Sequence, residues 1–371
     1  NQGKRPGFTP AAVTAGAVST VTVYATDSSY NWDTSTVALV QLSFDPAGSV
    51  YDDNYAAAAS TGVLNLVGGT TSFQIVLRTA ELGGGAKTSR VVALSTTNVL
   101  LSAETQSIPV SPAAMVKLQL LAPGETAVPG KPPYDYGETA GGRTGAPEEW
   151  TAGAPSTVTV RFTDAFWNLV PSHSAVVDLR SQDPKDDAVN PDPKSFTVDG
   201  SSKTLWRLIQ ANTSPGWKLR AESGSVLKST TPALVVNPAV HTRLQVLLPG
   251  EVADPGGATG KTAAPPSPWT AGLPYTVTVN AVDDYYNVVT GVSDIVQMDI
   301  THDVYGAPQT IAQPLQNGTT TFTFTLKVAT AAGAGFGGRL RATNNTTPAV
   351  PVAYSEYFTV NSSDAVKLQV L

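Results

Sequence analysis

The chain has 371 residues, enough for about two to four ordinary domains, and a formal net charge of -6, with 23 Lys and Arg against 29 Asp and Glu. It has no basic field for nucleic acid or anionic lipid and no apolar run long enough for a membrane-spanning helix, so we expect neither a nucleic-acid partner nor a transmembrane segment. The lack of Cys excludes disulfides and thiolate chemistry, and low charge with abundant Thr, Ser and Val favours an extracellular β protein.

The first predicted elements are a strand and a turn that occur three times. Thr-Ala-Gly is followed closely by Thr-Val-Thr-Val within residues 14–23, 151–160 and 270–279. Each copy continues to an Asp and, four residues later, an Asn, with an aromatic residue directly before the Asn. Repetition at long, nearly constant spacing indicates tandem modules, and the Thr-Val alternation predicts a strand that leads into an Asp-to-Asn turn.

Further along each copy, apolar residues alternate with polar ones at 69–80, 200–211 and 318–329, which align without a gap. A period of two predicts strands with one buried face. Two connectors rich in Gly and Pro, 123–149 and 249–268, lack this alternation, and we expect them to be ordered loops without strands.

A short basic-Leu-Gln-apolar-Leu segment recurs about every 125 residues, at 117–121, 243–247 and 367–371. Strand-length segments separated by Gly, Pro, Asn and Asp predict an all-β chain of three tandem immunoglobulin-like antiparallel β-sandwich domains, with roughly seven strands each. The expected domains are 1–116, 117–242 and 243–366, followed by 367–371 as a separate C-terminal strand.

The order of Thr-Ala-Gly, Thr-Val-Thr-Val and the Asp-to-Asn turn resembles the bacterial immunoglobulin-like repeats of surface adhesins and invasin-type stalks. The resemblance covers all three units. It departs from that pattern at Tyr30, Trp167 and Tyr286, where those repeats usually carry Gly before the turn Asn. It implies an extracellular structural protein, with a donor-strand-exchanged filament subunit as one form of it.

The repeat is out of phase with the chain. Unit 1–116 has no opening basic-Leu-Gln strand, whereas one further copy of that strand has no domain after it. The further copy is Lys367, Leu368, Gln369, Val370 and Leu371. An incomplete sandwich exposes an apolar groove and an unpaired edge, and a strand of another copy fits both, which predicts a head-to-tail homopolymer. A window cut from a longer tandem protein explains the same phase.

No residue constellation indicates catalysis. The three His residues lie in unmatched contexts and no Gly-x-Ser-x-Gly motif is present, so we expect no enzyme, no catalytic residue and no cofactor. The turn oxygens suit calcium, but such side chains also cap turn amides without a metal, which we favour. The metal candidates are Asp27, Asn31, Asp164, Asn168, Asp283, Asp284 and Asn287. The acidic cluster of Asp183, Asp186, Asp187 and Asp192 is expected to be a solvated loop.

Two further features leave other partners open. Recurrent aromatic residues could stack on sugars, although their register favours packing in the core or turn; they are Tyr30, Trp150, Trp167, Trp269 and Tyr286. Possible glycosylation sites are Asn212, Asn317, Asn344, Asn345 and Asn361. The alternatives to a filament are therefore a carbohydrate-binding or adhesive module that contacts glycans or host surfaces, and a spacer of a secreted enzyme.

Overall fold

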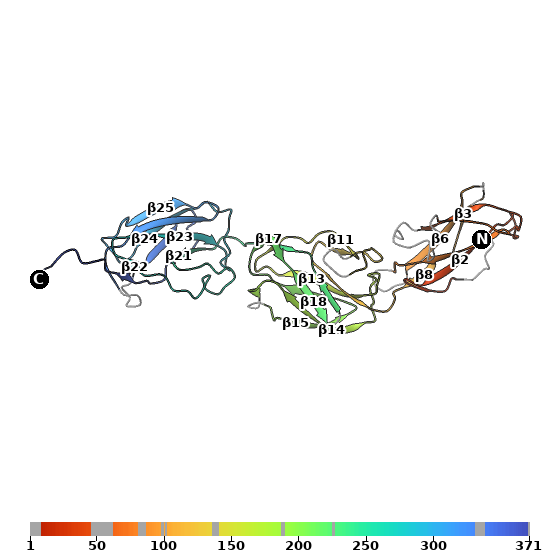
Figure 1. The fold of residues 1–371 in the computed structure, drawn as a ribbon, viewed down its shortest axis with the longest axis horizontal. Coiled ribbons are helices and arrows are strands. Elements are labelled where there is room, and N and C mark those ends of the chain that lie inside the picture. The colour runs from red at the N-terminus through yellow and green to blue at the C-terminus, as the bar shows by residue number, and fades with distance from the viewer. Residues whose placement is uncertain are drawn as a thin grey trace.

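The computed structural model describes residues 9–45, 62–80, 87–97, 100, 102–135, 141–186, 190–224, 227–330 and 338–369. Within these ranges the chain is all-β, as predicted, and holds no α-helix. None of the described residues therefore forms a helix long and apolar enough to cross a membrane. The strands fall into three groups that lie in a row along the long axis of the molecule (Figure 1).

The first group forms two sheets. Its strands are β1 (Val13–Thr14), β2 (Val18–Tyr24), β3 (Leu39–Asp45), β4 (Val63–Asn65), β5 (Thr70–Val76), β6 (Lys87–Ser95), β7 (Ala103–Glu104) and β8 (Ile108–Ser111). The larger sheet has the order β1-β8-β6-β3-β4, with β7 beside β6, and the smaller sheet is the pair β2-β5. The alternation predicted for 69–80 is confirmed, because Phe73, Ile75 and Leu77 are buried.

The second group has the same plan with one more strand beside the Thr-Val strand. Its strands are β9 (Lys117–Leu121), β10 (Thr126–Ala127), β11 (Arg143–Thr144), β12 (Trp150–Thr151), β13 (Ser156–Thr163), β14 (Ser174–Ser181), β15 (Lys194–Asp199), β16 (Ser201–Trp206), β17 (Asn212–Trp217), β18 (Leu219–Ser223), β19 (Leu227–Thr230) and β20 (Leu234–Asn237). Its main sheets are β16-β13-β9 and β15-β14-β18-β19, with β12-β20-β17 beside them.

The third group repeats this arrangement. Its strands are β21 (Arg243–Leu247), β22 (Trp269–Thr270), β23 (Pro274–Val282), β24 (Ile295–Ile300), β25 (Thr310–Pro314), β26 (Thr319–Thr325), β27 (Leu340–Asn344), β28 (Ala353–Tyr354) and β29 (Val360–Asn361). The sheets are β21-β23-β26, β25-β24-β27-β28 and the pair β22-β29.

Each group encloses its own hydrophobic cluster between facing sheets. In the second group, Leu118 and Trp206 from one sheet pack in the same cluster as Leu179 and Ala221 from the other. The first and third groups have separate clusters of the same kind. Each group is therefore a β-sandwich with a core of its own.

The sheets are not purely antiparallel, which corrects the expectation. One short strand in each group runs parallel to the closing strand: β1 with β8, β12 with β20, and β22 with β29. The Gly of Thr-Ala-Gly allows this change of sheet, because Gly153 has a φ of 75° and its N–H donates to the O of Leu208, which follows β16 of the other sheet. The chain crosses from one sheet to the other at this residue, as only Gly does readily.

The connectors are not free of strands. β10 and β11 pair within 123–149, and Ala253 bridges to Lys261 within 249–268. A buried ion pair accompanies the first pairing, because Arg143 Nη1 lies 3.0 Å from Glu125 Oε1. The prediction that the connectors form no strands was therefore wrong. Polar contacts hold these short pairs together, so they need no alternation of apolar residues.

The acidic cluster is only partly a solvated loop. Asp183 and Asp186 are buried, whereas Asp187 lies outside the described residues. Asp183 Oδ2 accepts hydrogen bonds from the backbone N–H groups of Ile209 and Gln210 at 2.6 and 2.9 Å. Asp186 Oδ2 accepts a hydrogen bond from Trp206 Nε1 at 2.8 Å, so both buried acids serve as internal acceptors.

Candidate strand-pairing site

The basic-Leu-Gln strand of the second group completes the edge of a sheet. β9 pairs antiparallel with β13, with Gln119 opposite Arg161 and Leu118 opposite Phe162. Leu118, Gln119 and Leu120 are fully buried. The apolar side chains of β9 belong to the core, so the strand is part of the sandwich.

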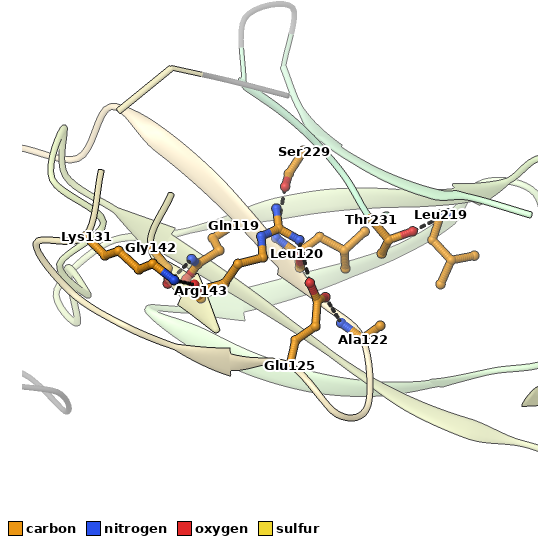
Figure 2. Close-up of polar contacts among 10 residues, drawn as sticks. All are labelled: Gln119, Leu120, Ala122, Glu125, Lys131, Gly142, Arg143, Leu219, Ser229 and Thr231. Carbon is orange, nitrogen blue, oxygen red and sulfur yellow. Dashed lines mark hydrogen bonds and ion pairs between the residues drawn. The ribbon is translucent and has the colours of Figure 1, made fainter. Parts of the chain in front are cut away.

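Polar contacts hold β9 in register (Figure 2). Gln119 Nε2 donates to Gly142 O at 2.8 Å, and Gln119 Oε1 accepts from Arg161 at 2.9 Å. The N–H of Leu120 donates to Ser229 Oγ at 3.0 Å. A buried Gln bonded at both ends of its amide fixes the position of the strand along the edge.

The loop directly after β9 is tied down by an acid. Glu125 Oε2 accepts the N–H of Ala122 at 2.9 Å, while Glu125 Oε1 pairs with Arg143 (Figure 2). Lys131 Nζ donates to Arg143 O at 2.7 Å. The connector thus folds back over the strand that precedes it.

The third group repeats these contacts around β21. Gln245 Nε2 donates to Gly260 O at 2.6 Å and Gln245 Oε1 accepts from Asn280 at 2.9 Å. Glu251 accepts the N–H of Leu248 at 2.7 Å and pairs with Lys261 at 2.9 Å. The two groups thus share the bonds at both ends of the Gln amide and the two contacts of the Glu, and these contacts define how a basic-Leu-Gln strand is seated.

The basic residue of the strand lies over the aromatic residue of the Asp-to-Asn turn. Lys117 Nζ is 4.1 Å from the ring centre of Trp167, and the Arg243 guanidinium is 5.5 Å from that of Tyr286. Burial lowers the pKa of Lys117, with Asp164 opposing that shift. The hydrogen bond to Tyr286 raises the pKa of Arg243. The turn and the strand are therefore packed as one unit.

The first group has an open position where the others hold this strand. Among the described strands, β2 pairs only with β5. Val21 and Val23 are partly exposed, whereas Val158 and Val160, their counterparts in β13, are fully buried. Tyr24, the counterpart of Arg161, is 55% exposed. Among the described residues, no strand covers the apolar surface and the backbone groups along this edge of β2.

The predicted donor strand is outside every sheet that the structure describes. Lys367, Leu368 and Gln369 are exposed and carry no strand, with Leu368 100% exposed and Val366 85% exposed. Val370 and Leu371 lie outside the described residues. In Figure 1 the described residues at the C-terminal end extend away from the third group, at the opposite end of the row from the first group.

The Asp-to-Asn turns use their oxygens as hydrogen-bond acceptors. Asp164 Oδ1 accepts the N–H groups of Phe166 and Asn168 at 2.8 and 2.9 Å. Asp27 and Asp283 repeat this inside their own turns. The hydrogen bond from the Asn31 side chain lowers the pKa of Asp27. The carboxylates therefore cap turn amides.

The metal candidates do not form a larger acidic cluster. Asp284 is exposed and pairs with Arg243 at 3.2 Å. The described residues contain no group of three or more His, Asp or Glu side chains placed to hold an ion. The turns alone thus provide the candidate oxygens.

The aromatic candidates differ in burial. Trp150, Trp167 and Trp269 are buried, Tyr286 is partly buried and Tyr30 is 51% exposed. Each buried Trp packs inside its own group, which agrees with the packing interpretation. The exposed member belongs to the group with the open edge.

The glycosylation candidates also differ. Asn344 is buried, and its Nδ2 donates to Asp294 Oδ2 at 2.7 Å, so this site is closed to a glycan in the folded chain. Asn212 is partly buried, and Asn317, Asn345 and Asn361 are exposed.

Sequence reasoning missed the structural part that the central Gln plays. Gln119 and Gln245 are each a single polar residue flanked by two apolar ones, in the sequences Leu-Gln-Leu and Leu-Gln-Val. A polar residue retained at that place in each copy was the available signal, because a buried amide needs partners on both sides.

The comparisons with known proteins identify no family. No family model matches the sequence and no curated protein matches it. Among solved structures, the native E. coli alpha-2-macroglobulin is 10% identical, over 96% of this chain and 22% of that chain, with a TM-score of 0.28. A glycosyl hydrolase family 2 member from Bacteroides cellulosilyticus is 14% identical, over 59% of this chain and 25% of that chain, with a TM-score of 0.22. This chain thus matches about a quarter of the length of these proteins, and the similarity carries no information about its activity.

Proposed function

We propose that this chain is a non-enzymatic structural subunit of an extracellular surface filament, built of three tandem immunoglobulin-like domains. The domains correspond to 1–116, 117–242 and 243–366. Strand 367–371 of one copy inserts beside β2 in the first domain of the next copy. The observation that carries the proposal is the open edge of β2, at the place where the other two sandwiches hold a strand of this same sequence pattern.

The register of the inserted strand follows from the repeats. Gln119 faces Arg161 and Gln245 faces Asn280, and Tyr24 is the residue of β2 at that position. Gln369 therefore lies opposite Tyr24, and Leu368 lies opposite Ala25. In this register Leu368 takes the place of Leu118, which is fully buried in its own group. Burying one such Leu side chain contributes about 1.5 to 3 kcal/mol, and the new ladder bonds add to it.

Other exposed side chains of the first group support the same surface. Tyr24 and Trp32 form an edge-to-face pair with ring centres 5.5 Å apart, and both are more than half exposed. Leu169, the counterpart of Trp32 in the second group, is buried. Large aromatic side chains left uncovered beside an open strand edge favour a protein partner.

The two surfaces lie at opposite ends of the row of sandwiches (Figure 1). Donor and acceptor are different surfaces, so the contact is heterologous and not self-complementary. Such a contact propagates into an open filament unless its rotation closes a ring. This geometry supports a fibre as the product of assembly.

The test is to change the donor strand without touching the folded subunit. Leu368→Asp alters a side chain that is 100% exposed, so we expect the subunit to fold as before. In the inserted strand the same change places a carboxylate in an apolar core, which abolishes assembly. Val366→Asp is the matched control, because its counterpart Val116 is 47% exposed in the second group.

Negative-stain electron microscopy and sedimentation measure the outcome. We expect filaments from the unchanged chain and from Val366→Asp, and monomers from Leu368→Asp. Filaments of normal yield from Leu368→Asp would contradict strand insertion. Monomers from the unchanged chain, at all concentrations, would contradict the filament and favour a longer polypeptide that fills the edge within itself.

A further inference from the structure

The Asp-to-Asn turn of the second group bonds to the first group. Asn168 Oδ1 accepts the N–H of Ala80 at 2.7 Å, and Asn168 Nδ2 donates to Arg78 O at 2.8 Å. Asp164 Oδ2 accepts the N–H of Ala113 at 2.9 Å. Asp164 and Asn168 are fully buried at this junction. We name these three hydrogen bonds the Asp–Asn clasp.

The second junction has the same clasp. Asn287 Oδ1 accepts the N–H of Ala211 at 2.8 Å, and Asn287 Nδ2 donates to Ile209 O at 2.9 Å. Asp283 Oδ2 accepts the N–H of Ala239 at 2.9 Å. Ala80 and Ala211 end the two aligned segments 69–80 and 200–211, so both clasps bind equivalent backbone groups. The recurrence makes the clasp a rule of how one sandwich follows another.

The turn of the first group is built in the same way but has no such partner. Asn31 Nδ2 donates to Asp27 Oδ2 at 2.9 Å, as its counterparts do within their own turns. Asp27 and Asn31 are exposed, and no bond to another strand group is found for them among the described residues. Within the part of the chain that the structure describes, this turn therefore has the internal hydrogen bonds of the clasp turns and lacks their bonds to a second strand group.

The complementary backbone groups lie on the third group. Segment 318–329 aligns with 69–80 without a gap, so Lys327 and Ala329 correspond to Arg78 and Ala80. Ser363 lies three residues after Val360, as Ala113 lies three residues after Val110. Lys327, Ala329 and Ser363 are exposed, whereas Ala80 is buried. One end of the chain thus offers the acceptor and donors that the other end lacks.

We propose that a second copy of this chain completes the clasp. Asn31 of one copy donates to Lys327 O and accepts the N–H of Ala329 in the preceding copy, and Asp27 accepts the N–H of Ser363. This inference rests on the proposed strand insertion and assigns a second contact to the same joint. The joint between copies then has the hydrogen bonding of the internal junctions, so successive sandwiches keep one rotation and one spacing along the fibre.

Two variants test the clasp from its two sides. Asn31→Ala removes the side chain that bonds to the preceding copy. Ala329→Pro removes the backbone N–H that donates a hydrogen bond to this side chain. We expect Asn31→Ala, which removes two hydrogen bonds, to raise the critical concentration for assembly by about 5- to 100-fold, and Ala329→Pro, which removes one, to raise it by about 2- to 10-fold. The double variant should lose no more than the Asn31 variant, because both changes break one contact. Asn345→Ala, an exposed Asn of the third group, is the control.

A peptide separates the clasp from strand insertion. A synthetic peptide of residues 362–371 carries the donor strand but neither Lys327 nor Ala329. It is titrated into Leu368→Asp chains, which have a vacant β2 edge, with and without Asn31→Ala. We expect affinities equal within about 2-fold, since the peptide makes only the Asp27 part of the clasp.

The outcomes are distinct. Assembly of Asn31→Ala and Ala329→Pro at the unchanged critical concentration would overturn the clasp and leave strand insertion standing. Equal losses of peptide binding and assembly in Asn31→Ala would also overturn it, because the side chain would then act within the first sandwich. Absence of both peptide binding and assembly in the parent chains would contradict the proposed function, and the clasp with it.

Discussion

The first and second sandwiches carry the same Thr-Val strand in two different states. β13 lies between β16 and β9, and its Val158 and Val160 are fully buried. β2 has β5 on one side, and its Val21 and Val23 are partly exposed. The difference teaches that the basic-Leu-Gln strand is an edge strand whose Leu side chains complete the core, and that a sandwich without this strand keeps the rest of its fold.

The largest expected effect comes from truncating the same Leu in two copies of the strand. Leu118→Ala should lower the free energy of unfolding of the second sandwich by about 2 to 5 kcal/mol, because Leu118 is fully buried. Leu368→Ala should change the stability of the monomer by less than about 0.5 kcal/mol, because Leu368 is 100% exposed. Urea denaturation of both variants measures the difference. Equal losses would show that the tail already packs within its own subunit.

Filling the open edge should stabilise the first sandwich and protect its β2 strand, as β9 does for β13 in the second sandwich. The 362–371 peptide at 100 times its Kd should stabilise the first sandwich of Leu368→Asp chains by about 2.7 kcal/mol. Hydrogen exchange should show slower exchange along β2 and unchanged exchange along β13. A peptide with Asp in place of Leu368 is the control. Protection spread evenly over all three sandwiches would argue against a site at β2.

Breaking an internal clasp should loosen the joint without opening an edge. Asn168→Ala leaves the N–H of Ala80 and the carbonyl of Arg78 without that partner, at a cost of about 1 to 3 kcal/mol. Small-angle scattering of a chain that also carries Leu368→Asp should then show a wider range of bend. Asn345→Ala should leave the scattering curve unchanged, and an unchanged curve for Asn168→Ala would mean that other contacts hold the junction.

An aromatic residue introduced at position 29 should stabilise the contact between copies. A Cβ built on Gly16 would lie 2.2 Å from Phe166 Cε2, and one on Gly153 2.0 Å from Tyr285 Cε2, so each ring covers the glycine of the preceding sandwich. The first turn has Ser29 at this place, and a Cβ on Gly272 meets nothing within 4 Å in the described structure. Ser29→Phe should stabilise assembly by about 0.5 to 1.5 kcal/mol. A higher critical concentration for this variant would contradict the shared geometry.

Acid should weaken the end of the third sandwich that carries Lys327, the end that the proposed joint places against the next copy. Burial alone would raise the pKa of Asp303, but hydrogen bonds from the backbone N–H groups of Lys327 and Val328 lower this pKa below its usual value. The stabilisation is thus fully present above about pH 4 and is lost as the pH falls through the lowered pKa. The contribution of Asp303 to the melting temperature should be constant from about pH 5 to 8 and should decrease below about pH 4. Asp303→Asn should reduce that fall, whereas Asp364→Asn, on the exposed tail, should not.

Much of the fold could be predicted from periodic patterns. The alternation in 69–80, 200–211 and 318–329 placed one face of each strand in the core, because that burial repeats every second residue. The Asp-to-Asn turns were predictable since both partners lie within five residues of one another. The parallel strands beside the Thr-Ala-Gly segments were not, because two residues give no period.

The clasp and the seat of the central Gln escaped prediction for a different reason. Asn168 bonds to backbone groups of Arg78 and Ala80, and any residue supplies such groups, so their identities carry no signal. Asp183 was assigned to solvent for the same reason, although it accepts two backbone N–H groups. Such partners are seen only in the three-dimensional arrangement of the strands.

The most direct measurement joins the donor strand to β2 with a disulfide. The chain has no Cys, and the proposed register sets Gln369 opposite Tyr24, as Gln119 is opposite Arg161, where paired Cα atoms lie about 4.5 to 5.5 Å apart. Tyr24→Cys chains mixed with Gln369→Cys chains under mild oxidation should give a dimer of one chain of each kind. Tyr24→Cys mixed with Val366→Cys should give little. Equal cross-linking of the two mixtures, or none in either, would contradict insertion of this strand at the open edge.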